Sequence, residues 1–525
     1  MLNKTAPLNI LFITTLFFLA ANLPLLKNIN DFMVILGPAI LLSLLLLWSM
    51  ALSKKVFYIF IFFLLPITAV GIYFRWLYQA SIDEDILLSL FINDWKLSSE
   101  MINPKLVLWT LSFTFLSFYF LTRFSPNSKL TIKKVFTVTI ILSLMFAAWL
   151  QLIGYELKGK GEIRDPKLLL SIHTFTPVDI LVSTQRALKS IKKIKQYTSY
   201  EKLSERYQYQ QKPVKDLTIV VIIGESTRGD HMHLNGYKEP TTPKLETLSN
   251  LISFPHVSSC DTLTLRSLPC MVSPLETNQT NRIPTQSSFA EVLHALGFYT
   301  YIFSLQGLDA FYHYLGYDQL MSKYAIIEHN KTIGAKDEAL LPFLAKALKD
   351  RQHHKKLIIL HTIGSHYRYL DRIQKKDRVF QPICHSSDLR SCSKDQITHM
   401  YDNTIYAIDN FLYHAIDLMK NQNAIVFYTS DHGESLGENG YYLHGAPLVN
   451  APKEQRNVPF IIWASPLFLS QKEEKDRFEH LKKISQHKTI SHDYLFHSIL
   501  GCSGITSDNK GIKADLNLCQ HTYMD

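Results

Sequence analysis

Cysteine is absent from the first 259 residues of this chain, and the long apolar runs within the first 155 carry almost no charge. No two of the six cysteines have the Cys-x-x-Cys spacing of a zinc or dithiol redox site, which disfavours a cysteine-ligated metal cluster. Cysteines gathered in one part of a chain indicate disulfides in an oxidising compartment. The simplest pairing joins neighbours: Cys260 with Cys270, Cys384 with Cys392, and Cys502 with Cys519.

The chain also lacks an internal repeat, a low-complexity segment and a basic array interleaved with aromatic residues. Its formal charge of +10 is spread thinly over 525 residues, so nucleic acid is not implied as a partner. An anionic lipid surface is a simpler partner for a basic protein. Five basic residues between 186 and 195 flank Leu188, Ile191 and Ile194. That spacing is typical of an amphipathic helix on a membrane and equally of a solvated linker helix.

Five apolar runs dominate the first 155 residues, at 8–26, 32–52, 56–74, 106–121 and 135–153. A helix needs about 20 apolar residues to cross a bilayer core, and each run reaches or approaches that length. One such run could be a buried helix or a signal peptide, but five in succession predict a polytopic membrane domain. The lysines and arginines of the short loops place the amino terminus in the cytoplasm and everything after about Gly154 outside it.

Beyond the apolar runs, the composition predicts a bridging segment at 156–215 and a globular domain at 216–525. Buried strands are expected at 218–223, 299–303, 357–361, 424–428 and 458–463. Helices are expected at 288–296, 340–348, 400–419 and 489–500. Nearly continuous apolar strands alternating with helices predict a three-layer α/β domain with a mostly parallel central sheet.

Polar motifs follow three of the predicted strands. Glu225 follows the first, His366 follows the third, and Asp431 with His432 follows the fourth. Ligands bind beyond the carboxyl ends of strands in open α/β sheets, so these side chains are expected to meet at one edge. Carboxylates and an imidazole form a ligand set suited to Zn²⁺.

A phosphate-binding metal also activates a nearby hydroxyl, so a serine or threonine nucleophile is expected. Residues 259–270 are rich in hydroxyl groups and bracketed by two cysteines, whose disulfide would hold the segment rigid. Composition does not choose among Thr262, Thr264 and Ser267. A hydrogen-bonded surface loop is the alternative interpretation.

These motifs resemble those of the phosphoethanolamine transferases of the Gram-negative inner membrane, especially the group that modifies lipid A and confers polymyxin resistance. The matching stretches are 221–237, the Ser-Cys to Pro-Cys segment 259–270, Tyr-Asp-Asn-Thr at 401–404, Ser-Asp-His-Gly-Glu-Ser-Leu-Gly-Glu-Asn-Gly at 430–440 with Leu-His-Gly at 443–445, and Ile-Ser-His-Asp at 490–493. The resemblance covers essentially the whole chain. It implies a transmembrane domain of five helices at 1–155, a bridging segment at 156–215, and a periplasmic domain at 216–525 with the alkaline-phosphatase or sulfatase fold.

The resemblance also implies roles for individual residues. The zinc ligands would be Glu225, Thr264, Asp431 and His432. Thr264 would be the nucleophile, and His366 and His444 would hold substrate phosphate or a second zinc. Ser89, Asn93 and Glu100 approximate the lipid-headgroup contacts of the family.

The implied reaction takes phosphoethanolamine from phosphatidylethanolamine onto Thr264, releases diacylglycerol, and passes the group to lipopolysaccharide. The stretch after His366 departs from the lipid A group, so the acceptor is either a lipid A phosphate or a core sugar. We expect a monomer in the bacterial inner membrane, with its catalytic domain in the periplasm and one or two Zn²⁺ ions.

Two alternatives stay open. One is a phosphoglycerol transferase or phosphodiesterase on the same scaffold, and the other is a catalytically inactive membrane sensor or scaffold. Sulfatase chemistry is disfavoured because residues 260–264 lack the proline of that nucleophile motif. Glu434 and Glu438 are expected either to accept hydrogen bonds from metal-binding histidines or to cap a helix.

Overall fold

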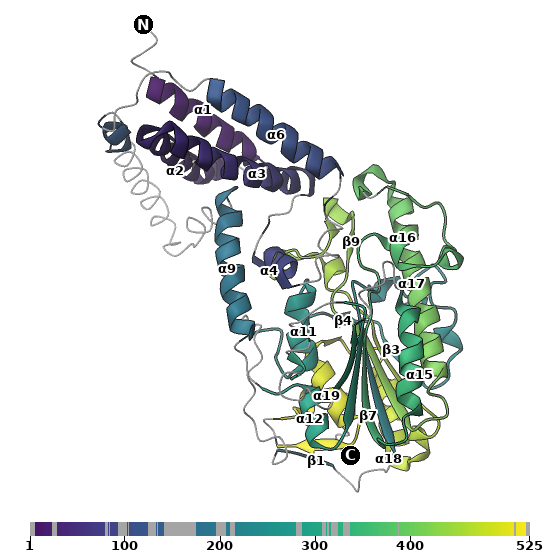
Figure 1. Cartoon of the computed structure of the whole chain (residues 1–525). Coiled ribbons are helices and arrows are strands. Elements are labelled where there is room, and N and C mark those ends of the chain that lie inside the picture. The colour runs from purple at the N-terminus through teal and green to yellow at the C-terminus, as the bar shows by residue number, and fades with distance from the viewer. Residues whose placement is uncertain are drawn as a thin grey trace. The chain divides into compact units, whose positions relative to one another are not determined.

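The computed structural model of the chain is shown in Figure 1. It describes residues 6–23, 29–78, 82, 84–92, 102, 104–123, 133, 135–140, 175–195, 206–209, 216–279, 286–306, 311, 314–316, 324–328, 336–386, 388–508 and 511–520. The chain divides into two compact units. The first comprises Met1–Leu88 and Ser98–Lys189, and the second comprises Ser89–Leu97 and Ser190–Asp525.

The first unit is a bundle of apolar helices. Its helices are α1 (Ala6–Ala21), α2 (Ile29–Leu52), α3 (Lys54–Tyr78), α6 (Pro104–Arg123), and the starts of α4 (Glu84–Ile92) and α9 (Val178–Lys195). Buried leucine, isoleucine and phenylalanine side chains of α1, α2 and α3 form its core. Many large apolar side chains of α6 are instead exposed, including Phe115 and Leu116, as expected of a helix that faces lipid.

Two helices in the described part of the chain are long and apolar enough to cross a membrane, Lys54–Leu77 and Pro104–Leu121. Helices α1 and α2 cover the first two predicted spans, but their described apolar stretches, Leu11–Ala21 and Pro38–Leu52, are shorter. Most of the fifth predicted span, 141–153, lies outside the described residues. The count of five spans therefore stays a prediction.

A buried polar cluster joins three helices of this bundle. The Arg75 guanidinium of α3 pairs with Asp179 of α9 at 2.7 Å and donates to Asn22 Oδ1, just after α1, at 2.6 Å. Asn22 Nδ2 in turn donates to the carbonyl of Thr176, and the Thr176 hydroxyl donates to Asp179. These bonds fix the first turn of α9 to the ends of α1 and α3, and they satisfy a charge pair that is costly to bury.

The second unit is built on a seven-stranded sheet in the order β3-β11-β8-β2-β7-β5-β6. Its strands are β2 (Leu217–Gly224), β3 (Leu251–Phe254), β5 (Tyr299–Ser304), β6 (Tyr324–Glu328), β7 (Lys355–His361), β8 (Ala424–Ser430) and β11 (Phe460–Ala464). Every residue of β2 and of β8 is buried, because helices cover both faces of the sheet. The short pairs β1 (Tyr207–Tyr209) with β13 (Ile505–Ser507), β4 (Val257–Ser258) with β12 (Ile490–Ser491), and β9 (Ser435–Leu436) with β10 (Tyr442–Leu443) lie outside it.

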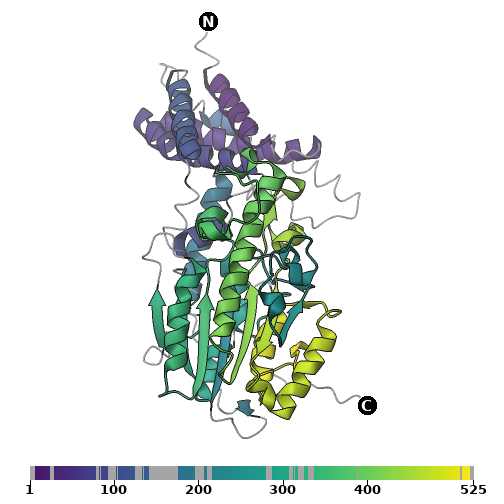
Figure 2. The same cartoon turned by 90° about the vertical axis from the view of Figure 1, so that its right-hand side faces the viewer.

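Helices form a layer on each side of this sheet (Figures 1 and 2). The helices α15 (Leu341–Lys349), α16 (Tyr369–Arg372) and α17 (Lys394–Asp417) lie on one side, and α11 (Thr264–Val272), α12 (Phe289–Ala295) and α19 (Asp493–Gly501) lie on the other. A further helix, α18, spans Lys472–Ile484. Capping boxes start α12 at Ser288 and α17 at Ser393, which explains why these helices begin where they do. The three-layer α/β architecture agrees with the prediction.

The sheet is mixed, and the antiparallel direction of β11 is the feature that the prediction of a mostly parallel sheet did not include. Strand β11 pairs antiparallel with both β3 and β8, and the other four pairings are parallel. A continuous apolar run such as Phe460–Ala464 reports burial on both faces but not strand direction. Strands β3 and β6 and helices α11 and α18 were not predicted, since they lack the long apolar runs used to find the others.

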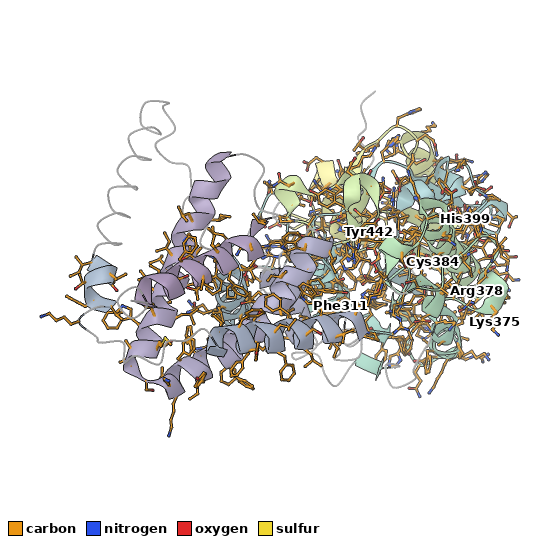
Figure 3. All side chains as sticks on the ribbon, turned by 90° about the horizontal axis from the view of Figure 1, so that it is seen from above. Phe311, Lys375, Arg378, Cys384, His399 and Tyr442 are labelled. Carbon is orange, nitrogen blue, oxygen red and sulfur yellow. A yellow bond between two sulfur atoms is a disulfide. The ribbon has the colours of Figure 1, made fainter. Side chains whose placement is uncertain are left out.

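Disulfides join the three expected cysteine pairs. Cys260–Cys270 spans the start of α11, Cys384–Cys392 closes the loop before α17, and Cys502–Cys519 ties the end of α19 to the carboxyl-terminal segment. In Figure 3 the labelled Cys384 lies in the same region as His399 of α17, whose Nδ1 contacts the carbonyl of Pro382. The described residues contain no free cysteine.

The Arg75–Asp179 pair gives a testable energetic prediction. Replacing one partner, as in Arg75→Met or Asp179→Leu, leaves a buried charge uncompensated and should lower the free energy of unfolding by about 3–5 kcal/mol. The double variant should cost less than the sum of the two, because no charge is then left buried. Equilibrium unfolding of the detergent-solubilised chain measures the free energies of the single variants and of the double variant. Lys420→Met, which removes an exposed pair with Asp417, is the control and should leave the unfolding midpoint unchanged. A double variant whose cost equals the sum of the two single costs would contradict the prediction.

Candidate metal centre and phosphoryl-transfer site

The register of the sheet brings the predicted site residues to one edge. Gly224 of β2 pairs with Ser430 of β8, and Ile223 pairs with His361 of β7. The next residues, Glu225 and Asp431, therefore leave the sheet at the same level. The sequence-based expectation that the carboxyl ends of these strands converge is met by the structure.

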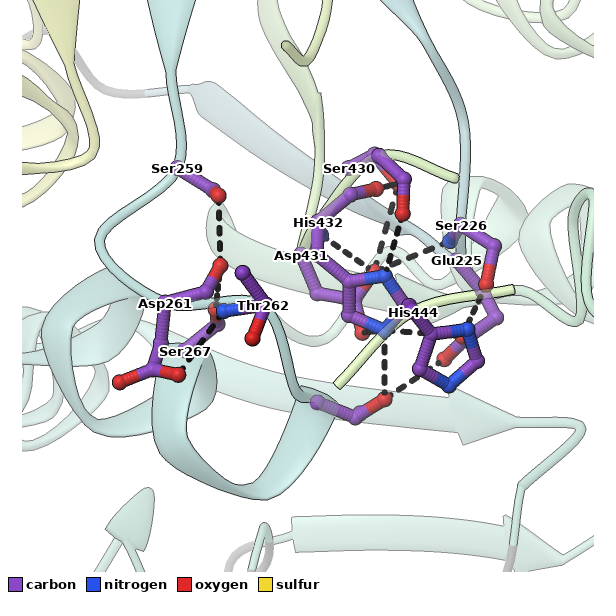
Figure 4. A network of polar contacts seen from close by, with 12 residues as sticks. Glu225, Ser226, Ser259, Asp261, Thr262, Ser267, Ser430, Asp431, His432 and His444 are labelled. Atoms are coloured by element: carbon purple, nitrogen blue, oxygen red, sulfur yellow. Dashed lines mark hydrogen bonds and ion pairs between the residues drawn. The ribbon is translucent and has the colours of Figure 1, made fainter. Parts of the chain in front are cut away.

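Glu225, Asp431 and His432 form one compact group (Figure 4). His432 Nε2 lies 3.4 Å from Glu225 Oε1 and 3.3 Å from Asp431 Oδ2. One ligand atom from each residue lies within 4.8 Å of the other two, and all three side chains are buried. This is the donor set and spacing that a single divalent metal requires.

The orientation of His432 suits a metal ligand. Its Nδ1 lies 2.8 Å from the carbonyl of Gly433, so Nδ1 carries the proton and the lone pair of Nε2 faces the carboxylates. Burial lowers the pKa of His432 to about 4. The ring is therefore neutral at pH 7, and its contacts with Glu225 and Asp431 are not ion pairs.

The electrostatics of Glu225 and Asp431 indicate that these two carboxylates need a cation between them. Burial, and then the neighbouring Asp431, raise the pKa of Glu225 to about 7. Burial also raises the pKa of Asp431, although Thr264 and backbone amides stabilise its anion. Asp431 Oδ1 accepts from the amides of Ser226 and His432, whereas Oδ2 is buried and has no hydrogen-bond partner among the described residues. A cation bound between these oxygens satisfies both groups, so the residues present fit a zinc ion.

Of the three candidate nucleophiles, Thr264 is the one whose hydroxyl reaches this group. Its Oγ1 lies 3.2 Å from Glu225 Oε2 and 3.2 Å from His432 Nε2. Thr264 is also the first residue of α11, and a helix N-terminus favours negative charge on a nearby oxygen. The two other candidates point elsewhere: Thr262 donates to the carbonyl of Ala446, and Ser267 donates to the carbonyl of Asp261.

His444 lies beside the group formed by Glu225, Asp431 and His432, and it makes contacts with His432 and Glu434. Its ring centroid is 4.1 Å from that of His432, and its Nδ1 lies 2.7 Å from Glu434 Oε2. Although burial disfavours its charge, Glu434 raises the pKa of His444 to about 9. His432, Glu434 and His444 form a second group with metal-ligand spacing. The His366 ring centroid is 6.0 Å from that of His444.

Of the two glutamates left open by the sequence, only Glu434 serves a histidine of the site. Glu438 instead pairs with Arg228 at 2.6 Å and accepts from the amide of Leu436. The predicted headgroup residues cannot be placed, because the side chain of Ser89 and all of Asn93 and Glu100 lie outside the described residues.

Two residues that hold the site were missed by the sequence analysis. Gln306 Nε2 donates to Glu225 Oε2 at 3.0 Å and to the carbonyl of Thr362 at 2.7 Å. Tyr369 donates to Glu434 Oε1 at 2.9 Å. Gln306 lies two residues beyond β5, so the rule that located Glu225 and Asp431 could have found it. Tyr369 lies in the four-residue helix α16, where no local pattern marks it.

Comparisons with known proteins agree with this organisation. The sulfatase family model matches residues 218–505, more than half of the chain. A second model, described as phosphoethanolamine transferase EptA/EptB, matches residues 40–190. A Kdo(2)-lipid A phosphoethanolamine 7''-transferase from Salmonella typhimurium is 37% identical over 310 residues, which cover 58% of this chain and 54% of that protein. The chain thus spans about half the length of the curated relatives it matches.

Solved structures show the same folds. The integral membrane lipooligosaccharide phosphoethanolamine transferase A (EptA) from Neisseria meningitidis matches with a TM-score of 0.78 at 23% identity, covering 98% of this chain and 96% of that chain. The C-terminal periplasmic domain of EcEptC from Escherichia coli, in complex with Zn, matches with a TM-score of 0.52 at 21% identity, covering 61% and 90%.

A glycine beside Glu225 provides a test of the metal centre. Gly364 has φ +49°, and a Cβ there would lie 2.4 Å from the carbonyl oxygen of Glu225. Gly364→Ala should displace Glu225 and lower the affinity for Zn²⁺ by on the order of 10- to 100-fold, as measured by competition with a chromophoric chelator.

Gly297→Ala is the matched control, because Gly297 also has a positive φ of +89° but a Cβ there would meet nothing within 4 Å. It carries the same kind of backbone strain without the clash and should bind Zn²⁺ as the wild type does. Equal zinc affinity in the two variants would count against Glu225 as a ligand.

Proposed function

The chain belongs to the sulfatase family, and on that premise we propose that it is a zinc-dependent transferase of phosphoethanolamine. The donor is phosphatidylethanolamine, and the acceptor is a lipopolysaccharide component, either a lipid A phosphate or a core sugar. The observation that carries the proposal is the position of the Thr264 hydroxyl, 3.2 Å from both Glu225 Oε2 and His432 Nε2 at the start of α11.

Thr264 acts as the nucleophile. Its Oγ forms a bond to the phosphorus of phosphatidylethanolamine, and the bond from phosphorus to the diacylglycerol oxygen breaks. The hydroxyl proton of Thr264 is lost and diacylglycerol leaves with one proton, so phosphoethanolamine remains on Thr264. An acceptor oxygen then attacks the same phosphorus, which restores the threonine.

The surrounding residues position this chemistry. Glu225, Asp431 and His432, with Thr264, would hold a zinc ion, which would supply charge stabilisation and lower the pKa of the hydroxyl. His444, whose ring centroid lies 4.1 Å from that of His432, is placed beside the phosphoryl oxygens. The start of α11 adds the field of its backbone amides at Thr264.

Three features support the lipid substrates and the location. The first unit contains two apolar helices long enough to cross a membrane, and it matches the EptA/EptB model. The relative from Salmonella typhimurium, 37% identical over 310 residues, carries phosphoethanolamine transferase and lipid A in its name. All three disulfides lie in the second unit, as expected for a periplasmic domain. We assign 1–155 to the inner membrane, 156–215 to the bridge and 216–525 to the periplasmic catalytic domain.

Thr264 can be tested by trapping the intermediate. The detergent-solubilised chain, incubated with phosphatidylethanolamine and no acceptor, should gain the mass of one phosphoethanolamine on the peptide that contains Thr264. Thr264→Ala should lose the adduct and lower turnover by at least about three orders of magnitude. Thr262→Ala, which removes a hydroxyl bonded to Ala446 instead, is the control and should keep the adduct.

An adduct that persists in Thr264→Ala would refute Thr264 as the nucleophile. A glycerophosphoryl adduct would indicate phosphoglycerol transfer instead. Water as the final acceptor would indicate a phosphodiesterase. Mass spectra of lipid A and of core oligosaccharide from expressing cells then identify the acceptor.

A further inference from the structure

His366 has a neighbour whose chemistry fixes which ring nitrogen is protonated. Arg372 Nη2 lies 3.3 Å from His366 Nδ1 and donates to the carbonyl of Tyr367 at 2.8 Å. Arg372 Nε donates to the carbonyls of Tyr367 and His366. Only 9% of the Arg372 side chain is exposed, so the guanidinium is held against the segment that carries His366.

A guanidinium has donors and no acceptor, and it stays charged in proteins. With a lone pair on Nδ1, His366 accepts a hydrogen bond from this guanidinium. In the neutral imidazole the proton is then on Nε2. An Nε2–H group can donate a hydrogen bond to a phosphate oxygen, but it has no lone pair with which to bind a metal.

The contacts of His444 indicate the opposite tautomer. Its Nδ1 lies 2.7 Å from the Glu434 carboxylate, which accepts hydrogen bonds and does not donate them when ionised. Nδ1 of His444 must therefore carry a proton. In the neutral ring its Nε2 has the lone pair, the arrangement that metal-binding histidines share.

The placement of possible ligand atoms is independent of this argument and agrees with it. Among the described residues, the groups with metal-ligand spacing are Glu225, Asp431 and His432, and His432, Glu434 and His444. His444 belongs to one of them and His366 belongs to neither.

His366 is nevertheless tied to the site. The amide of Ser365 donates to the carbonyl of Glu225 at 2.9 Å, and the Ser365 hydroxyl accepts from Thr404 at 2.7 Å. These bonds keep the segment that carries His366 in register with a zinc ligand and with α17.

We propose that Arg372 is a positioning residue that makes His366 a hydrogen-bond donor to substrate phosphate and excludes it from zinc binding. This proposal rests on the proposed function in one respect, which is that the substrate supplies the phosphate that His366 contacts. The sequence implies the same two possible roles for His366 and His444, namely holding phosphate or a second zinc. The two histidines thereby take different roles, with the proton on Nε2 in His366 and on Nδ1 in His444.

Zinc binding tests the proposal without reference to transfer. The full chain in detergent is titrated with Zn²⁺ against a chromophoric chelator. His366→Ala and Arg372→Met should bind the same number of ions as the wild type, with affinities within about threefold. His432→Ala is the positive control and should lose at least about tenfold in affinity. Loss of an ion, or a tenfold weaker affinity, in His366→Ala would overturn the proposal.

Kinetics with phosphatidylethanolamine test the donor role. Removing one donor to the developing phosphoryl charge should lower kcat by about 10²-fold in His366→Ala and Arg372→Met, with KM within about threefold. His366→Gln should stay within about tenfold of the wild type, because its amide N–H replaces Nε2–H but binds zinc poorly. Arg368→Met, which removes a half-exposed arginine paired with Asp371, is the charge-matched control and should be unaffected.

The outcomes separate this proposal from the proposed function. If His366→Gln is as slow as His366→Ala, or if Arg372→Met keeps full kcat, the donor role is wrong. If Arg372→Met does not fold, the two His366 variants decide, since His366 is only half-buried. If the wild type transfers no phosphoethanolamine, the proposed function fails, and the zinc titration alone still decides whether His366 is a ligand.

Discussion

Two carboxylates buried side by side at the end of the sheet are the constraint on which the site depends. Glu225 and Asp431 leave adjacent strands at the same level, where water does not reach them. The neutral imidazole of His432 relieves neither the repulsion between these carboxylates nor the cost of burying them. A bound cation resolves this imbalance, and of the candidate nucleophiles Thr262, Thr264 and Ser267 it is Thr264 whose hydroxyl reaches both Glu225 and His432.

The surrounding structure holds these few atoms in place. Gln306 and Ser226 fix the two oxygens of Glu225, and backbone amides fix Asp431. Ser226 itself has a positive φ of 54°, a strained conformation for a residue with a side chain. The disulfide Cys260–Cys270 brackets the turn that presents Thr264 at the start of α11. Such support matches what a nucleophile needs, because small displacements reduce catalysis strongly.

Much of this could be predicted from the sequence, for identifiable reasons. The buried runs that became β2, β7 and β8 are continuous and apolar, and the motifs that follow them mark the edge where ligands gather. The direction of β11 could not be predicted, since burial does not encode direction. Gln306 follows the end of β5 and could have been found by the same rule, whereas Tyr369 and Arg372 lie in the short helix α16, where no spacing along the chain marks them. The membrane unit remains less defined, because most of the fifth apolar run lies outside the described residues.

Glu225, Asp431 and His432 are arranged to hold a zinc ion beside the Thr264 oxygen. An anomalous difference map of the zinc-loaded protein, recorded at the zinc absorption edge, would locate that ion. We expect a peak within about 2.0–2.2 Å of one atom from each of these four residues. A peak centred on other residues, with none at Glu225 and Asp431, would rule out this metal centre.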